Sequence, residues 1–234
     1  AVGTLAATHL RLQIGTLVVG SAGTLLLAVG LAAAASVAAG LFYLVNSTLV
    51  AAALFLLADR IGFARAALGD LLRPGAFDGG RERLGVMFLV CAVAVAGVPP
   101  LAGFMGKAML LQAAGPTAWG TWAVAVVLAS SLLLMVALAR SGSVLFWSPA
   151  PDARGAPAPT TGAASDALPT ATSHRWALGL LLAAVLACSA AAGPLSRYSA
   201  ATAAQLFERQ AYLQAVLQAE PAPAAIDVRL EMRE

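Results

Sequence analysis

The chain has 234 residues, of which 60% are hydrophobic and only 11% are charged, and its mean hydropathy is +0.85. Soluble domains carry about 25% charged residues, so this composition excludes an ordinary soluble protein and predicts a polytopic membrane protein. The 14 Lys and Arg residues exceed the 11 Asp and Glu residues by only three. An excess this small favours topology signals in the loops and argues against a nucleic-acid partner.

The sequence lacks the residue patterns of a metal centre or of a hydrolase. Cys91 and Cys188 both lie in apolar runs, where we interpret them as buried thiols rather than as a disulfide or metal pair. His9 and His174 are isolated, and no nucleophile–base set or phosphate-binding loop is present. We therefore expect no catalytic residue, no metal and no cofactor.

The first 58 residues predict two membrane helices. No charged residue occurs between Arg11 and Asp59, and this run is long enough for two spans of about 20 residues each. We place the helices at about 12–30 and 33–58. The second helix carries a polar cluster at mid-span that consists of Tyr43, Asn46, Ser47 and Thr48. Such side chains either hydrogen-bond to a neighbouring helix or line a hydrated path.

Residues 59–83 form a polar connector between spans. The connector contains five arginines, a density that marks the cytoplasmic side of a membrane protein. Apolar residues from Phe63 to Leu72 recur at helical spacing. We therefore expect a short amphipathic helix on the membrane surface, ended by Pro74 and Gly75.

The third span, at about 84–114, is too long for one regular membrane helix. The residues that predict a break within it are Gly97, Pro99, Pro100 and Gly103. Lys107, the only lysine in the chain, follows this break. An amine within a span is costly and is therefore usually functional, so we predict that Lys107 belongs to an ion or proton path. The alternative is an amine that snorkels to the membrane interface.

The remaining chain predicts two more membrane helices. The fourth lies at about 119–146 and has Trp residues near both ends, which suits an interfacial belt. Residues 148–174 are rich in Pro, Ala, Ser, Thr and Gly, a composition typical of a disordered linker. The fifth helix, at about 175–192, is followed by an amphipathic helix at 199–217 and a polar tail at 218–234. We place the connector and the linker on the same side of the membrane. The pattern then predicts five spans.

The motif from Pro99 to Lys107 reads Pro-Pro-Leu-Ala-Gly-Phe-Met-Gly-Lys, and residues 41–59 carry the polar cluster of the second span. Both stretches resemble the D-type subunit of the multisubunit monovalent cation/proton antiporters of the Mrp or Pha class, where they match the broken twelfth helix and the eleventh helix. Residues 139–147 and 193–206 resemble the end of the thirteenth helix and the C-terminal tail. The Pro-Pro motif also occurs in the wider superfamily, which includes the antiporter-like membrane subunits of respiratory complex I.

The resemblance implies an all-α fold of 14 helices with two inverted five-helix repeats, each with a broken helix. Residues 1–147 then correspond to the end of helix nine through helix thirteen, and residues 175–217 to the last membrane helix with an amphipathic extension. The chain begins without Met, and we expect it to be a piece of a longer protein in a bacterial inner membrane. The implied partners are the other antiporter subunits, the lipid bilayer, H⁺, and Na⁺ or K⁺.

One departure from the family pattern affects the expected path. The residues that the resemblance and the polar pattern assign to this path are Lys107, Asn46, Ser47, Thr48 and Tyr43. The family usually has His at the position of Asn46. Asn holds a water or a hydrogen bond but cannot carry a proton near neutral pH, so a relay through this helix has to run through water or stop.

Three functions fit these observations. The main hypothesis is a proton- and cation-translocating subunit of a multisubunit antiporter, which is a secondary transporter rather than an enzyme. The second is a proton-pumping, antiporter-like subunit of complex I or of a membrane hydrogenase, and co-purification with NADH-oxidising or hydrogenase subunits would favour it. The third is a structural subunit without transport of its own, and transport by this chain alone would exclude it.

Overall fold

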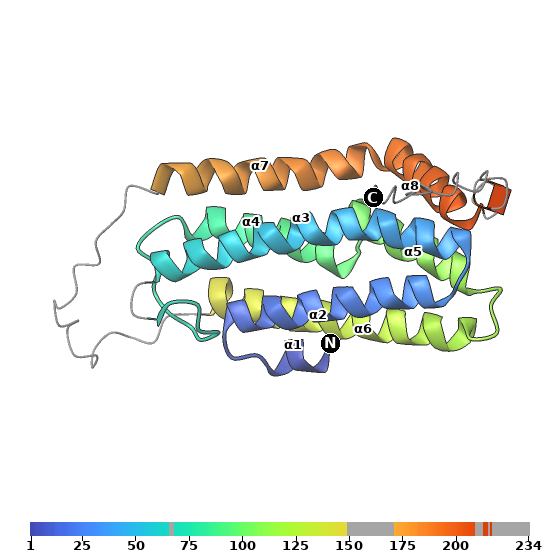
Figure 1. The fold of residues 1–234 in the computed structure, drawn as a ribbon. Coiled ribbons are helices and arrows are strands. Elements are labelled where there is room, and N and C mark those ends of the chain that lie inside the picture. The colour runs from blue at the N-terminus through green and yellow to red at the C-terminus, as the bar shows by residue number, and fades with distance from the viewer. Residues whose placement is uncertain (66–67, 149–170, 209–212, 215, 217–234) are drawn as a thin grey trace, which may run out of the picture.

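The computed structural model describes residues 1–65, 68–148, 171–208, 213–214 and 216. These residues form a bundle of helices that run along one another (Figure 1), and the one β-bridge among them pairs His9 with Leu71. The helices are α1 (Val2–Ala6), α2 (Leu10–Gly30), α3 (Ala34–Ala64), α4 (Arg81–Ala96), α5 (Ala102–Ala114), α6 (Gly120–Gly142), the π-helical turn η2 (Ser143–Trp147), α7 (Ala171–Ala190) and α8 (Ala192–Phe207).

The long apolar helices make this chain a multi-pass membrane protein. Within the described residues, α2, α3 and the continuous α6–η2 helix are each long and apolar enough to cross a membrane. The pair α7 and α8, bent by 76°, adds a fourth candidate span. The helices α4 and α5 have only 16 and 13 residues and follow one another along the bundle (Figure 1). The break between them falls where the sequence predicts one, and neither helix alone is long enough to cross a membrane.

Helix α3 is the centre of the packing, because it contacts α2, α4, α5, α7 and α8. Small residues on its buried face allow this close approach, which is the usual basis of helix association in membranes. A Cβ atom added to Gly40, for example, would lie 2.9 Å from the Cβ atom of Ala28 in α2. Large buried side chains such as Phe42 and Leu54 fill the space between the helices.

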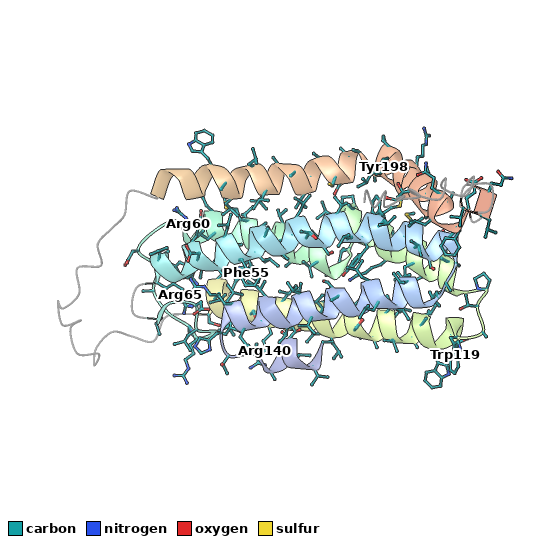
Figure 2. All side chains as sticks on the ribbon, viewed as in Figure 1. Phe55, Arg60, Arg65, Trp119, Arg140 and Tyr198 are labelled. Carbon is teal, nitrogen blue, oxygen red and sulfur yellow. The ribbon has the colours of Figure 1, made fainter. Side chains whose placement is uncertain are left out.

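The predicted topology agrees with the helix ends and turns that lie at each end of the bundle. The start of α2, the connector and the start of α7 lie at one end, and the turns that follow α2 and α5 lie at the other (Figure 1). Figure 2 shows Arg60 and Arg65 at the first end and Trp119 and Tyr198 toward the second. The arginine-rich end is the one that the sequence analysis places on the cytoplasmic side.

The predicted surface helix in the connector is wrong. Helix α3 continues beyond Asp59 to Ala64, and Ile61 in this added turn is fully buried in the core. The carboxylate of Asp59 accepts a hydrogen bond from the Arg11 guanidinium at 2.7 Å. Of the described residues between Arg65 and Arg81, Leu68 lies in a 3₁₀ turn and none lies in an α-helix.

Arg65 holds this connector in its folded shape. Its side chain is only 3% exposed, and its guanidinium donates to the carbonyl oxygen of Leu71 at 2.6 Å and to that of Arg73. The guanidinium also lies 5.7 Å from the centre of the Phe77 ring. These bonds satisfy backbone carbonyls that a helix would otherwise satisfy, so the loop is stable without helical hydrogen bonds.

The C-terminal helices begin earlier than predicted. Helix α8 starts at Ala192 instead of residue 199, with Pro194 in its first turn, where a missing N–H group costs no helical hydrogen bond. Helix α7 starts at Ala171. The predicted linker falls mostly outside the described residues, as do the polar tail and much of the predicted helix beyond Phe207.

Replacing Arg65 with Ala is expected to lower the free energy of unfolding by about 2 kcal/mol, since partly buried carbonyls lose a charged donor. Thermal unfolding in detergent measures this change. Arg73→Ala is the matched control, because it removes an exposed arginine from the same loop and keeps the backbone carbonyl that Arg65 binds. Equal melting temperatures for the two variants would contradict the role assigned to Arg65.

Candidate functional site

The break between α4 and α5 follows from two consecutive prolines. In a continuous helix the carbonyls of Val95 and Ala96 would accept hydrogen bonds from the N–H groups of residues 99 and 100. Pro99 and Pro100 have no N–H group, so α4 ends at Ala96. The break therefore leaves two carbonyl oxygens without helical donors inside a predicted membrane span.

Lys107 supplies the missing donors. Its Nζ atom donates to the carbonyl oxygens of Val95 and Ala96, both at 3.0 Å. The side chain is 9% exposed, so the amine stays within the bundle instead of snorkelling toward the end of α5. The two carbonyls also form the negative end of the α4 dipole, which favours a cation at this point.

Two glycines allow α5 to pack closely against the end of α4 at the break. Gly97 ends α4 with φ at +77°, and a Cβ atom there would lie 2.9 Å from the Cδ atom of Lys107. A Cβ atom on Gly103 would collide with the carbonyl oxygen of Ala94. Any side chain at either position would push α5 away from α4 and displace the amine from its carbonyl partners.

A side chain of α7 accepts a hydrogen bond from the backbone at the start of α5, on the other side of the break. The first N–H group of α5, at Ala102, donates to the Oγ atom of Ser189 at 2.9 Å. That hydroxyl in turn donates to the Val185 carbonyl of its own helix at 3.1 Å. Sequence analysis missed Ser189, because a single serine in an apolar helix carries no signal of a partner 87 residues away.

The polar cluster of α3 divides into two groups. Asn46 is 2% exposed and reaches the break from the α3 side, since its Nδ2 atom lies 3.3 Å from the position of a Cβ on Gly103. Tyr43 is also buried, and its hydroxyl donates to the Oγ atom of Ser21 in α2 at 3.3 Å.

The other two residues of the cluster bond to their own helix. The hydroxyls of Ser47 and Thr48 both donate to the Leu44 carbonyl, at 3.1 and 2.8 Å. Thr48 is exposed and Ser47 is half-buried. The fold thus brings Tyr43, Asn46 and Lys107 into the interior, while Ser47 and Thr48 lie toward the outside of α3.

Comparison with known proteins assigns the family. A family model described as "NADH:quinone oxidoreductase/Mrp antiporter, TM" matches residues 1–133, more than half of the chain. The chain belongs to this family. Its structure is also similar to the structure of the Mrp complex from Dietzia sp. DQ12-45-1b, with a TM-score of 0.72 and 26% identity over 92% of this chain and 46% of that chain.

Curated antiporter subunits are similar along most of the chain. One is the probable D subunit of a K⁺/H⁺ antiporter from Rhizobium meliloti (strain 1021), which is 32% identical and is aligned over 93% of this chain and 43% of its own length. Another is the D subunit of a Na⁺/H⁺ antiporter from Bacillus subtilis (strain 168), which is 28% identical over 79% of this chain and 34% of its own length. The chain therefore spans less than half the length of these relatives, which are named as transporter subunits and not as enzymes.

Gly103→Ala is expected to destabilise the protein by about 2 kcal/mol, because the added methyl group overpacks the contact with Ala94. It should also expose the Lys107 amine to an amine-reactive label, which peptide mapping by mass spectrometry detects at the only lysine of the chain. In the matched control, Gly23→Ala, the added Cβ atom meets nothing within 4 Å. Equal stability and equal labelling of the two variants would contradict the tight packing at the break.

Proposed function

We propose that this chain belongs to the membrane subunit that moves protons and monovalent cations in a multisubunit cation/proton antiporter, with Lys107 as the group that takes up and releases the proton. The observation that carries this proposal is the position of Lys107 inside a broken helix, bound to the two carbonyls that Pro99 and Pro100 leave without donors. Relatives named as D subunits of Na⁺/H⁺ and K⁺/H⁺ antiporters support H⁺ with Na⁺ or K⁺ as the transported ions.

The two carbonyls suggest how proton and cation movement are coupled. Unwound backbone carbonyls at broken helices are common ligands for small cations in secondary transporters. The protonated amine of Lys107 occupies the oxygens of Val95 and Ala96 as a hydrogen-bond donor. Once the amine loses its proton it also loses its charge, and the same oxygens become available to Na⁺ or K⁺. Occupation of one pair of oxygens by either the protonated amine or the cation is the mutual exclusion that antiport requires.

Asn46 fits this proposal as a water-binding group. Its Oδ1 atom is buried and accepts no hydrogen bond from the described residues, and buried polar atoms of this kind usually bind water. An amide cannot carry a proton, so the path past α3 runs through water held by Asn46. The complete transporter, its other subunits and its place in a bacterial inner membrane are part of the same proposal and are supported by the names of the relatives.

Lys107→Ala is expected to lower antiport driven by a pH gradient by about 100-fold or more, as for the loss of a general acid–base group. Lys107→Arg should be similarly inactive, because a guanidinium keeps its proton at any physiological pH. The measurement is Na⁺- or K⁺-dependent recovery of a collapsed pH gradient in vesicles that hold the complete complex with this chain.

Met105→Ala is the matched control for these variants. It shortens an unbranched side chain on the exposed side of the same helix, where Met105 is 41% exposed, and should leave antiport unchanged. Assembly of each variant complex is checked by co-purification. Normal exchange by Lys107→Ala in an assembled complex would exclude the proposed role and would favour a purely structural chain.

Asn46→Leu is expected to reduce antiport several-fold, because leucine keeps the branched arrangement of four heavy atoms and removes the polar atom that binds water at the break. Asn46→His should retain transport, since imidazole offers a hydrogen-bonding nitrogen at the same place. The same vesicle assay compares the two variants with the unchanged chain. Full activity of Asn46→Leu would show that the path bypasses α3.

A further inference from the structure

A groove between α4 and the continuous α6–η2 helix has a polar end and an apolar end. The polar end is a cavity of about 580 Å³ at the start of α4, with Arg81, Glu82 and Trp147 among its lining residues. The apolar end is a cavity of about 150 Å³ that continues along α4 to the break. The two cavities share Leu89 and Trp147, so they form one surface, the α4–α6 groove, which is lined by residues between 81 and 98 and between 135 and 147.

Small residues make the apolar end of the groove hollow. Ala92 and Ala96 of α4 and Ala139 and Gly142 of α6 all line it, and none of its described lining residues is charged. Leu89 at its edge is exposed, so this end is open on the outside of the bundle, where a membrane protein meets lipid. An open apolar hollow of this kind suits a hydrocarbon chain.

Arg81 is held in a fixed place at the polar end of the groove. Its Nε and Nη2 atoms donate to the carbonyl oxygen of Phe146 at 2.9 and 2.6 Å, and Nη2 also donates to that of Ser148 at 3.3 Å. These carbonyls end the α6–η2 helix and have no helical donors of their own. The Nη1 atom donates to no described residue, so its two N–H groups are available to an oxyanion such as a phosphate.

The length of the groove matches one leaflet of a bilayer. Arg81 and Ala96 are the first and last residues of α4, and the helical rise places them about 22 Å apart. A leaflet is about 20–22 Å thick when its headgroups are included. Trp147 at the polar end also suits the membrane interface. A lipid with its phosphate at Arg81 therefore extends an acyl chain toward Ala96 and Val98, next to the break.

We propose that the α4–α6 groove binds one phospholipid, with its phosphate on the Arg81 guanidinium, its ammonium on the Glu82 carboxylate and an acyl chain in the apolar end. The opposite charges of Arg81 and Glu82 match a headgroup that carries both a phosphate and a primary ammonium, as phosphatidylethanolamine does. Phosphatidylglycerol has no ammonium, and the quaternary ammonium of phosphatidylcholine has no N–H group to donate. Binding of this lipid does not depend on the proposed transport function.

Photo-crosslinking tests where the lipid binds. The probe is phosphatidylethanolamine with a diazirine in one acyl chain, mixed into phosphatidylcholine nanodiscs that hold the complete complex with this chain. After illumination, peptide mapping by mass spectrometry locates the labelled residues. Labelling is expected between residues 88 and 98 and between residues 135 and 142, which line the apolar end. Absence of label from both segments would mean that the groove has another occupant and would overturn the proposal.

Competing lipids test which headgroup the groove prefers. Unlabelled phosphatidylethanolamine should displace the probe about tenfold more effectively than phosphatidylglycerol or additional phosphatidylcholine, as expected for one charge-assisted hydrogen bond. Inorganic phosphate should not displace it, because it has no acyl chain. Equal displacement by the three lipids would indicate ordinary boundary lipid, and displacement by phosphate would indicate a site for a soluble anion. Either result overturns the proposal.

Ala139→Leu tests the apolar end of the groove. It should lower labelling about tenfold, because the larger side chain displaces about two methylene groups of the acyl chain. Ala129→Leu is the matched control, since it makes the same change at an exposed position of α6 that does not line the groove, and it should leave labelling unchanged. Equal labelling of the two variants would place the acyl chain elsewhere and contradict the proposal.

Glu82→Gln tests the polar end without touching the bonds of Arg81. It should make phosphatidylethanolamine and phosphatidylglycerol equally effective as competitors while the groove remains labelled. Asp78→Asn removes another exposed carboxylate that does not line the groove, and it should leave the preference unchanged. A full preference for phosphatidylethanolamine in Glu82→Gln would show that this carboxylate does not bind the headgroup and would overturn the assignment.

Discussion

The constraint on which this structure depends is that a membrane interior offers no water to unpaired backbone groups. Pro99 and Pro100 remove two helical donors within a span, and Lys107 restores hydrogen bonds to the carbonyls of Val95 and Ala96. A lysine amine in such a place is both a structural donor and a titratable group. In the proposed function, the atoms that stabilise the broken helix are also the atoms that a proton or a cation occupies.

Residues of the surrounding helices pack around the break between α4 and α5. Gly103 lets α5 approach α4 at a distance that no larger residue permits, and Ser189 of α7 accepts the first N–H group of α5. From the other side, α3 presents Asn46 at the break. Residues of α3, α4, α5 and α7 therefore meet at the break.

The sequence predicts the long apolar helices and the break between α4 and α5, because both follow from local chemistry. A run without charge predicts a membrane helix, and two prolines end a helix whatever surrounds them. The predicted surface helix in the connector fails because its apolar spacing says nothing of the Arg65 guanidinium, which bonds to carbonyls six and eight residues ahead. Asp59, where the sequence analysis ends the second span, likewise bonds to Arg11, which lies 48 residues earlier in the chain.

By itself, the sequence determined that this is a multi-pass membrane chain with a broken third span and one lysine beside the break, since composition, prolines and charge are local properties. Only the tertiary structure decided which groups meet. It joined Lys107 to Val95 and Ala96 and Tyr43 to Ser21, and it turned Thr48 toward the outside. Such a site depends on how helices rotate and pack, and no single stretch of sequence contains that information.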